Sequence, residues 1–301
     1  SFPTRRSSDL EDKRSELLSF WSTVEMPARL AKLADRLRNQ RSLPEIIVAY
    51  PDTWGICNPI EHTTRIEAWI EMAEGYVQQM PPELPDEIIQ CFGIDNGFYH
   101  IALMPFVHIA LNRLSVLPNR FVVNEFLELE SSKFSTSRGH AIWARDLLAI
   151  TGADRLRLQC SVSRPETRRE NFTYESIAST NTLYIEWTRI LESAIVAVAK
   201  LHDHNAPANT ESSHPKSNVL DALCEQVINL VLHPSGSIQA ATYVTDAIMR
   251  VLKTHVDELN SASGNRQVEL LASLVSGLAT FRDSLQIFTP ELARKIDSVL
   301  E

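Results

Sequence analysis

The spacing of apolar residues changes once along this chain, and the change limits the folds that it can adopt. Up to about residue 157, short apolar runs such as residues 46–48 and 121–123 have the length of buried strands, with helical spacing between them around residues 102–114. Buried strands that alternate with helices are typical of a parallel α/β sheet. After Thr173 every periodic segment has the spacing of a helix. The sequence therefore predicts an α/β region followed by an all-helical region.

Apolar residues three or four positions apart predict helices that bury one face each. Between Glu16 and Leu37 this spacing is interrupted by Pro27, a residue that disrupts helix interiors. Residues 205–218, rich in Pro, Ser, Asn and Thr, predict a surface loop. The domain boundary is expected between residues 158 and 172, which gives domains of residues 11–160 and 161–301. Beyond Thr173 the expected buried faces are Leu183, Trp187, Ile190, Ala194 and Val198; Val244, Ile248, Val251, His255 and Leu259; and Leu270, Leu274, Leu278 and Phe281.

Composition excludes several classes of protein. The net charge of -9 argues against a broad basic surface and therefore against tight non-specific binding of nucleic acid. No apolar stretch approaches the roughly 20 residues that a membrane-spanning helix needs, so no membrane partner is predicted. The cysteines are far apart and form no CxxC pair, which favours reduced thiols in a cytoplasmic protein over a disulfide framework or a metal site. They are Cys57, Cys91, Cys160 and Cys224.

The first ten residues differ in character from the rest of the chain. They read SFPTRRSSDL and resemble a translated sequencing adapter, so residues 1–10 are interpreted as an artefact. On this interpretation the natural protein extends upstream and the chain is a fragment.

One short segment combines hydroxyl groups, cations and a glycine. Residues 133–139 read KFSTSRG, which resembles the KMSKS loop of class I aminoacyl-tRNA synthetases, where lysines offset charge that develops on pyrophosphate. Residues 140–158 read HAIWARDLLAITGADRLRL and resemble the segment that follows this loop in the methionyl enzyme. Agreement in order and spacing over residues 54–158 is more specific than any single motif. The upstream matches are Trp54, Gly55, Ile56, Pro59, Trp69, Gly75, Tyr76, Phe92, Gly93, Asp95, Tyr99, His100, Pro105 and residues 121–123.

The chain thus resembles a divergent member of the methionyl-tRNA synthetase family. The resemblance implies the later half of a Rossmann-like catalytic domain, followed by a helical domain similar to an anticodon-binding domain. It implies ATP-dependent activation of an amino acid, with ATP and Mg²⁺ as cofactors, and transfer to tRNA as the ancestral activity. The family's His-Ile-Gly-His motif and zinc-binding insertion belong upstream, so the chain alone is expected to be inactive.

The resemblance also implies roles for residues of the ATP site. Asp95 would bind the ribose, because a carboxylate accepts hydrogen bonds from two hydroxyl groups. Gly93 would let the backbone approach the nucleotide closely. Lys133, Ser135 and Ser137 would contact the triphosphate and take part in catalysis.

The amino-acid pocket is implied in the same way. Trp69, Tyr76 and His100 would line it, and Met104 stands where the family has an aromatic residue. Trp69 and Tyr76 are seven residues apart, so they also fit the core face of a single helix. Both interpretations stay open on the sequence alone.

Two carboxylates stand out in the segment that begins at Trp69. An apolar pocket for a thioether does not need Glu71 or Glu74, whereas a cationic substrate would favour a carboxylate. On a helix, Glu74 lies closer than Glu71 to the face of Trp69. Glu74 is therefore the expected charge partner of a cationic analogue of methionine, although both carboxylates are about as often solvated.

Several positions depart from the family pattern. Thr136 replaces the second lysine of the loop, and loss of such a charge costs about 3–4 kcal/mol of transition-state stabilisation. Residues 49–51 read Ala-Tyr-Pro where the family has Ser-Arg-Asp, and Ile94 replaces a lysine. In the helical domain, the positions that read the anticodon are by spacing Glu186, Ile190 and Ala194, and the later Pro-Trp pair is missing.

These departures leave alternatives open. One is a working methionyl-tRNA synthetase whose missing cations lie upstream. Another is a tRNA-independent enzyme of secondary metabolism, similar to the synthetase-like domains of hydrazine synthetases. A third is a degenerate synthetase that serves as a binding module. tRNA stays a candidate partner, although the residues expected to read the anticodon are absent.

Overall fold

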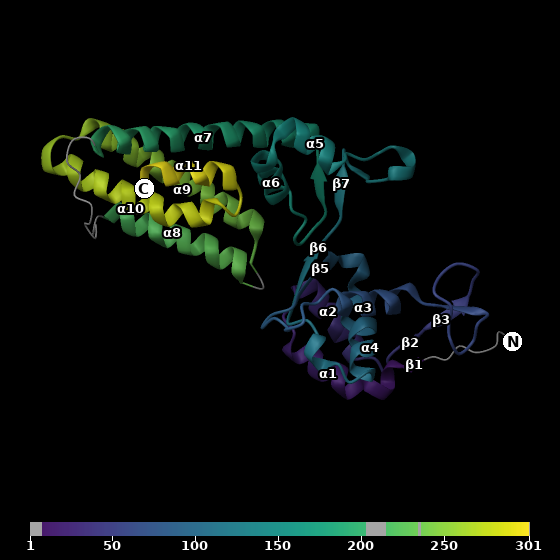
Figure 1. Cartoon of the computed structure of the whole chain (residues 1–301). Helices are drawn as coiled ribbons and strands as arrows, with labels where there is room; N and C mark the ends of the chain where they lie inside the picture. Colours follow the sequence, from purple (N-terminus) through teal and green to yellow (C-terminus); the bar gives the residue numbers. More distant parts are fainter. Residues whose placement is uncertain (1–7, 203–214, 234–235, 301) are drawn as a thin grey trace. The chain divides into compact units, whose positions relative to one another are not determined.

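The chain divides into two compact units in the computed structural model, which describes residues 8–202, 215–233 and 236–300. Unit 1 is Ser1–Glu125 and unit 2 is Phe126–Glu301 (Figure 1). Unit 1 contains strands and helices and unit 2 is mainly helical, which confirms the predicted α/β region followed by an all-helical region. The units part before residue 160 because β7 (Leu127–Leu129) pairs with β9 (Glu170–Phe172). The family-based boundary at residue 160 stays a prediction.

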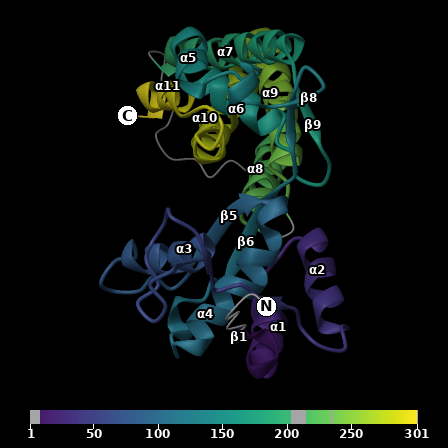
Figure 2. The same ribbon diagram turned by 90° about the vertical axis from the view of Figure 1, so that its right-hand side faces the viewer.

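A pair of parallel strands lies at the centre of unit 1. β5 (Ile89–Gly93) pairs with β6 (Arg120–Asn124), so that Gly93 lies opposite Asn124 at the carboxyl ends of both strands. Figure 2 shows α3 (Ala68–Gln78) and α4 (Met104–Ala110) to one side of the strands, and α1 (Arg14–Thr23) and α2 (Ala28–Arg38) to the other. As predicted, Pro27 separates two helices, because it stands directly before α2 in an extended conformation.

Short segments complete unit 1. β1 (Ser8–Asp9) pairs with β2 (Glu45–Ile46), and β3 (Ala49–Pro51) pairs with β4 (Thr64–Ile66). Leu10, the first residue of a 3₁₀ turn (Leu10–Lys13), is fully buried in the core. Residues 8–10 therefore take part in the fold although the sequence argument set them aside, and residues 1–7 lie outside the described residues.

Unit 2 begins with a hairpin and continues with helices. β7 pairs with β8 (Ser132–Lys133) through a turn in which Glu130 and Ser131 have φ of 46° and 62°. Two short helices follow, α5 (Ala144–Thr151) and α6 (Ala153–Val162). The bundle consists of α7 (Tyr174–His202), α8 (Pro215–Leu232), α9 (Ile238–Ser261), α10 (Gly264–Leu285) and α11 (Pro290–Leu300).

The core of the bundle contains most of the predicted apolar faces. Trp187 is fully buried, and its indole Nε1 donates a hydrogen bond to Asp246 Oδ1 at 2.9 Å. Among the described residues, no helix is long and apolar enough to cross a membrane. The predicted residues that are buried are Trp187, Ile190, Ala194, Val198, Ile248, His255, Leu259, Leu270, Leu274, Leu278 and Phe281.

Two carboxylates that lie outside the bundle helices cap the amino-terminal ends of α11 and α9. Asp154 of α6, only 2% exposed, accepts hydrogen bonds from the backbone N–H groups of Glu291 at 3.0 Å and Leu292 at 2.8 Å, which begin α11. Glu166 accepts one from the N–H of Ile238 at 2.6 Å, which begins α9. A helix start presents unpaired N–H groups and partial positive charge, so both carboxylates stabilise the helices that they cap.

We predict that Asp154→Ala lowers the free energy of unfolding by about 2 kcal/mol, because two buried N–H groups lose charge-assisted hydrogen bonds. Urea denaturation of the 301-residue chain, followed by helical circular dichroism, measures the change. Asp257→Ala is the matched control, since Asp257 is an exposed partner of Lys253 at 3.3 Å and should contribute little. Equal effects of the two substitutions would show that the cap is not a stabilising contact.

Candidate functional site

An aromatic cluster in unit 1 surrounds His100. The imidazole stacks on Phe92 of β5, with ring centroids 3.8 Å apart and planes 1° from parallel. Trp69 of α3 meets the imidazole edge-on at 5.8 Å and stacks on Tyr99 at 4.1 Å. Tyr76, two turns after Trp69, lies 6.3 Å from the His100 ring. The structure therefore brings together the three residues that the sequence placed in an amino-acid pocket.

A π-helical turn holds His100 in this position. The turn spans Tyr99–Leu103 and leads directly into α4. Trp21 Nε1 donates a hydrogen bond to the carbonyl of Ile101 at 2.6 Å, in the buried core. Single π turns inside helices are often found at functional sites. Here the turn brings His100 over Phe92, and the contact with Trp21 fixes it from the core side.

His100 is a neutral group in this cluster. Its side chain is almost fully buried, at 2% exposure, and burial lowers the pKa of the imidazole from 6.5 to about 4. Nδ1 donates a hydrogen bond to Gln90 Oε1 at 3.0 Å. With Nδ1 as the donor, Nε2 of the neutral ring is an acceptor. The cluster thus offers aromatic surface and one acceptor, without a charge.

Glu74 does not face this cluster, which corrects the expectation of a charge partner for a cationic substrate. Its carboxylate pairs with Arg113 at 2.5 Å. The hydrogen bond from Arg113 lowers the pKa of Glu74. The reason is helical geometry, because a residue five positions after Trp69 points about 140° away from it. Glu71 is exposed to solvent.

The residues of the predicted pocket differ in how deeply they are buried. Met104 is 1% exposed and belongs to the core of unit 1, as does Ala73 between Trp69 and Tyr76. Trp69 is half-buried and Tyr76 is 37% exposed. Trp69 and Tyr76 thus lie at the rim of the core, which favours a pocket over the alternative that both are plain core residues.

Gly93 and Asp95 lie at the carboxyl end of β5. Asp95 is exposed in a 3₁₀ turn (Ile94–Asn96), and a Cβ atom added to Gly93 would lie 2.7 Å from Asp95 Oδ1. A side chain at position 93 would therefore require the Asp95 carboxylate to move. Ligands of open parallel sheets bind outside the carboxyl ends of the strands, so the position suits a nucleotide.

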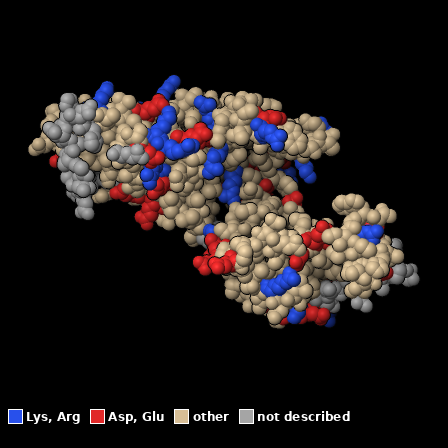
Figure 3. Space-filling model, viewed as in Figure 1, with Lys and Arg blue, Asp and Glu red and all other residues tan. Residues whose placement is uncertain are grey.

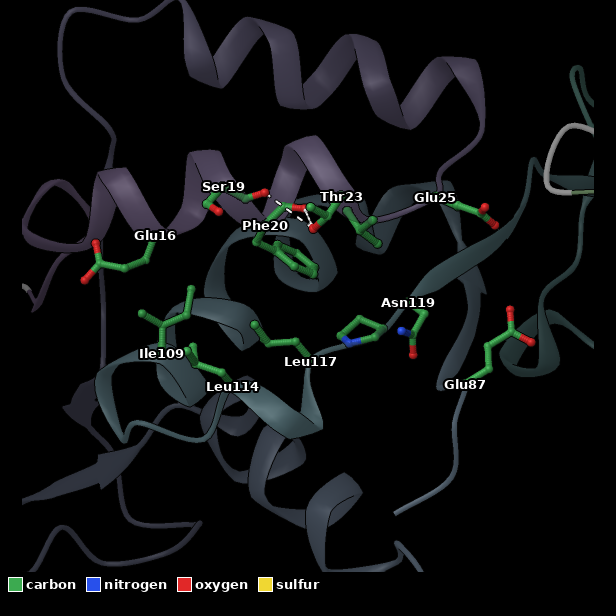
Figure 4. A pocket seen from close by; sticks show the side chains of 12 residues that line it. Glu16, Ser19, Phe20, Thr23, Glu25, Glu87, Ile109, Leu114, Leu117 and Asn119 are labelled. Atoms are coloured by element: carbon green, nitrogen blue, oxygen red, sulfur yellow. Dashed lines mark hydrogen bonds between the residues drawn. The ribbon is translucent and has the colours of Figure 1, made fainter.

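A cavity of about 650 Å³ in unit 1 lies at the other end of the strands. Figure 4 shows Phe20 and Glu25 on one side of it and Leu117 and Asn119 on another. The N–H of Asn119 donates to the carbonyl of Ile88 at 2.8 Å, just before both strands begin. The cavity is therefore at the amino ends of β5 and β6, away from Asp95, and we do not assign the substrate to it.

The loop that resembles KMSKS is a closed turn in unit 2. The N–H of Ser135 donates to the His140 carbonyl at 2.8 Å, and the N–H of His140 donates to the Ser135 carbonyl at 2.9 Å. Ser135 Oγ and Ser137 Oγ are 3.2 Å apart. Lys133, at the end of β8, is exposed, and so is the uncharged Thr136. The loop thus presents two hydroxyl groups and one lysine on a turn fixed at its base.

Two of the three positions expected to read an anticodon lie inside the bundle, which corrects the spacing argument. Ile190 is 7% exposed and Ala194 is fully buried, whereas Glu186 is exposed. Residues four apart share one helix face, and here that face turns into the core. On the face of unit 2 drawn in Figure 3, basic and acidic side chains are interspersed, in line with the expectation from net charge.

Sequence reasoning missed Gln90, which orients His100. Gln90 and Phe92 are two residues apart on β5, so both side chains point to the same face of the strand. A polar residue within an otherwise apolar strand was the available signal. Among the described residues, no group of three His, Cys, Asp or Glu side chains could hold a metal ion.

The chain is similar in sequence to known proteins. The family described as tRNA synthetases class I (M) matches residues 9–185. The methionine–tRNA ligase of Bacteroides fragilis is 28% identical over 175 residues, which cover 52% of this chain and 26% of that protein. The enzyme of Thermomicrobium roseum is 26% identical over 235 residues, covering 68% of this chain and 39% of that protein. The chain therefore spans well under half the length of these relatives.

Solved structures show the same fold. Mycobacterium tuberculosis methionyl-tRNA synthetase in complex with methionyl-adenylate has a TM-score of 0.73 at 17% identity, covering 95% of this chain and 61% of that chain. The apo form of that enzyme has a TM-score of 0.71 at 16% identity, covering 96% of this chain and 61% of that chain.

We predict that His100 makes stability depend on pH. Its pKa in the folded chain, about 4, is below the ordinary 6.5, so the unfolded chain binds the proton more tightly. Stability is then fully present above pH 6.5 and is lost, by about 3 kcal/mol, as the pH falls through this interval. Urea denaturation of wild type and His100→Phe at pH 7, 5.5 and 4.5 measures the difference.

The comparison of wild type with His100→Phe includes an internal control. Burial also lowers the pKa of His108, but that residue is present in both proteins and its contribution cancels. Phenylalanine keeps the stack on Phe92 and cannot be protonated. Parallel stability curves for the two proteins would contradict a buried neutral imidazole at position 100.

Proposed function

We propose a function from one premise: this chain belongs to the class I (M) tRNA synthetase family and is a relative of methionyl-tRNA synthetase. The protein activates an amino acid with ATP and forms an aminoacyl-adenylate and pyrophosphate. The names of its relatives extend the proposal to tRNA as the acceptor of the acyl group. Because the chain spans only part of those relatives, the activity is proposed for any longer natural form that contains it.

One observation carries the proposal for the amino acid, namely the uncharged aromatic cluster around His100. Trp69, Tyr76 and Phe92 present apolar faces and edges, and His100 adds an acceptor without a charge. Aromatic rings bind thioether sulfur favourably, by about 0.3–1.5 kcal/mol per contact. The carboxylate of Glu74, which suggested a cationic analogue, forms an ion pair with Arg113. The cluster therefore favours methionine.

Each unit, taken by itself, carries residues that are proposed to contact ATP. In unit 1, Asp95 is an exposed acceptor suited to the ribose hydroxyl groups, and Gly93 provides the close backbone approach. In unit 2, Lys133 and the hydroxyl groups of Ser135 and Ser137 are suited to phosphate oxygens. Mg²⁺ would arrive bound to the phosphates of ATP, a binding mode that needs few protein ligands.

The chemical step is an in-line displacement. A carboxylate oxygen of the amino acid attacks the α-phosphorus of ATP, and the bond from that phosphorus to the bridging oxygen breaks. Pyrophosphate leaves with the electron pair and gains negative charge. Lys133 stabilises this charge, since a fixed cation acts most strongly where charge develops. Thr136 contributes none, so the step is expected to be slow.

We expect Trp69→Ala to raise the KM for methionine at least tenfold and to leave the KM for ATP nearly unchanged. Loss of one aromatic wall removes apolar contact worth about 1.5–3 kcal/mol. ATP–pyrophosphate exchange, measured with a longer natural form that contains this chain, gives both constants. Trp143→Ala is the matched control, because Trp143 is 62% exposed and belongs to unit 2. Methionine-independent exchange, or equal effects of the two substitutions, would overturn the assignment.

A second prediction concerns the loop. Thr136→Lys should raise the rate of adenylate formation by roughly ten- to a thousandfold, because it adds a cation where pyrophosphate leaves. The exposed threonine can be replaced without disturbing the core. Thr136→Met has a side chain of similar length without charge and serves as the control. An unchanged or lower exchange rate in Thr136→Lys would mean that the loop does not contact the phosphates.

A further inference from the structure

His140 closes the loop of residues 134–139 in unit 2. Gly139 precedes it with φ of 67°, a left-handed conformation that turns the chain back. The backbone N–H and carbonyl groups of His140 then pair with those of Ser135. The imidazole makes a further contact, since its Nε2 lies 2.8 Å from the carbonyl oxygen of Leu129. His140 therefore joins the end of the loop both to its beginning and to β7.

The contact with Leu129 is a hydrogen bond in which His140 donates. A backbone carbonyl oxygen can only accept, so the proton is on Nε2. The neutral tautomer that is protonated at Nε2 and the doubly protonated ring both carry this proton. The contact is thus kept whether the imidazole is neutral or charged, and only a change of side chain removes it.

Leu129 is a firmly held point of unit 2. It ends β7, the middle strand of a three-stranded sheet, where its partners are Ser132 of β8 and Phe172 of β9. Only 4% of Leu129 is exposed. The N–H of Glu130, the next residue, donates to the Phe172 carbonyl at 3.1 Å. The hydrogen bond from His140 therefore ties the loop to a residue that is buried and paired on both sides.

Little else holds the loop against this sheet. Residues 136–139 are all exposed, and none of residues 134–140, all of which the structure describes, is buried. Ser135 Oγ and Ser137 Oγ contact each other. Among the described residues, His140 has the one side chain of segment 134–140 that forms a hydrogen bond or ion pair outside the segment. Segments with few buried contacts open most easily, so loss of this imidazole should free the loop.

We propose that His140 is a positioning residue for the loop. Its imidazole keeps Lys133, Ser135 and Ser137 in one arrangement for the phosphates of ATP. This role rests on the function proposed above, in which these groups stabilise the charge of the departing pyrophosphate. Groups that are already in place act on that charge without reorganisation, whereas mobile groups must first be ordered. His140 itself does not contact the substrate.

Limited proteolysis of the 301-residue chain measures the opening of the loop. Trypsin cleaves after arginine, and Arg138 is exposed in the loop. We expect His140→Ala to speed cleavage after Arg138 about fivefold, because loss of one hydrogen bond increases the population of the open form. Cleavage after Arg168, which is exposed in a different loop of unit 2, is the internal reference and should keep its rate.

Two amides separate loss of the hydrogen bond from loss of the ring. Glutamine carries its Nε2 as many bonds from the backbone as histidine does, so His140→Gln can still donate to the Leu129 carbonyl. Asparagine carries the same amide one bond closer to the backbone, so His140→Asn should not reach. We expect cleavage after Arg138 in His140→Gln at nearly the rate of wild type, and in His140→Asn at the rate of His140→Ala.

Exchange kinetics show whether the position of the loop matters for the reaction. In a longer natural form that contains this chain, His140→Ala and His140→Asn should lower the kcat of ATP–pyrophosphate exchange about fivefold. The KM for methionine should stay unchanged, because the loop does not contact the amino acid. His140→Gln should restore kcat.

Three results would overturn the role of His140. They are equal cleavage after Arg138 in wild type and His140→Ala, an unchanged kcat in His140→Ala, and His140→Gln that behaves like His140→Ala in both assays. Failure of the proposed function gives a different result, namely no exchange in wild type or in Thr136→Lys. That result would also refute a role of His140 in the reaction, even where the protease rates respond to its substitution.

Discussion

The parallel pairing of β5 and β6 determines where unit 1 can form a site. Its register places Gly93 opposite Asn124, so the chain leaves both strands at the same edge of the sheet. Within β5, alternation puts Gln90 and Phe92 on one face, and His100 uses both of them. Phe92 supports the imidazole from below and Gln90 fixes its tautomer. The cluster and the edge with Gly93 and Asp95 are therefore consequences of one short strand.

The distribution of charge in unit 1 agrees with the apolar character of its aromatic cluster. Burial keeps His100 neutral, and Arg113 occupies the carboxylate of Glu74. The aromatic cluster thus keeps no charge for a side chain to pair with. Charge is instead present at Asp95 and on the exposed Lys133 of unit 2. Selection of an apolar side chain and stabilisation of phosphate charge make opposite demands on solvation, so the uncharged cluster is suited to the first of these tasks.

Sequence alone predicted the elements that depend on local spacing. The order of α/β and helical regions, the break at Pro27 and the buried face around Trp187 all follow from periodicity, and the structure confirms them. The order of motifs brought Trp69, Tyr76 and His100 together correctly. The prediction for Glu74 was wrong because it depends on a contact with a residue that is distant in sequence. Glu74 was misjudged because Arg113 follows it by 39 residues.

The assignment of anticodon-reading positions by spacing was wrong for a different reason. Spacing from a motif fixes a position along a helix but says little about rotation, and an error of one residue turns a side chain by about 100°. Ile190 and Ala194 were already part of a periodic apolar face in the sequence, and that pattern predicted the core correctly. Motif spacing taken from a family can disagree with the periodic spacing of apolar residues in the chain itself. In that case the periodic spacing predicts which residues are buried.

The buried polar groups of unit 2 separate into two kinds. Both oxygens of Asp154 accept hydrogen bonds from the start of α11, and Glu166 holds the start of α9. These carboxylates complete the fold and have nothing left to offer a ligand. Gln159 is nearly as buried, but only its NH₂ group is used. Its Oε1 has no hydrogen-bond partner among the described residues, which costs about 1–3 kcal/mol. The carboxylates that hold the bundle together are therefore those whose oxygens all accept hydrogen bonds.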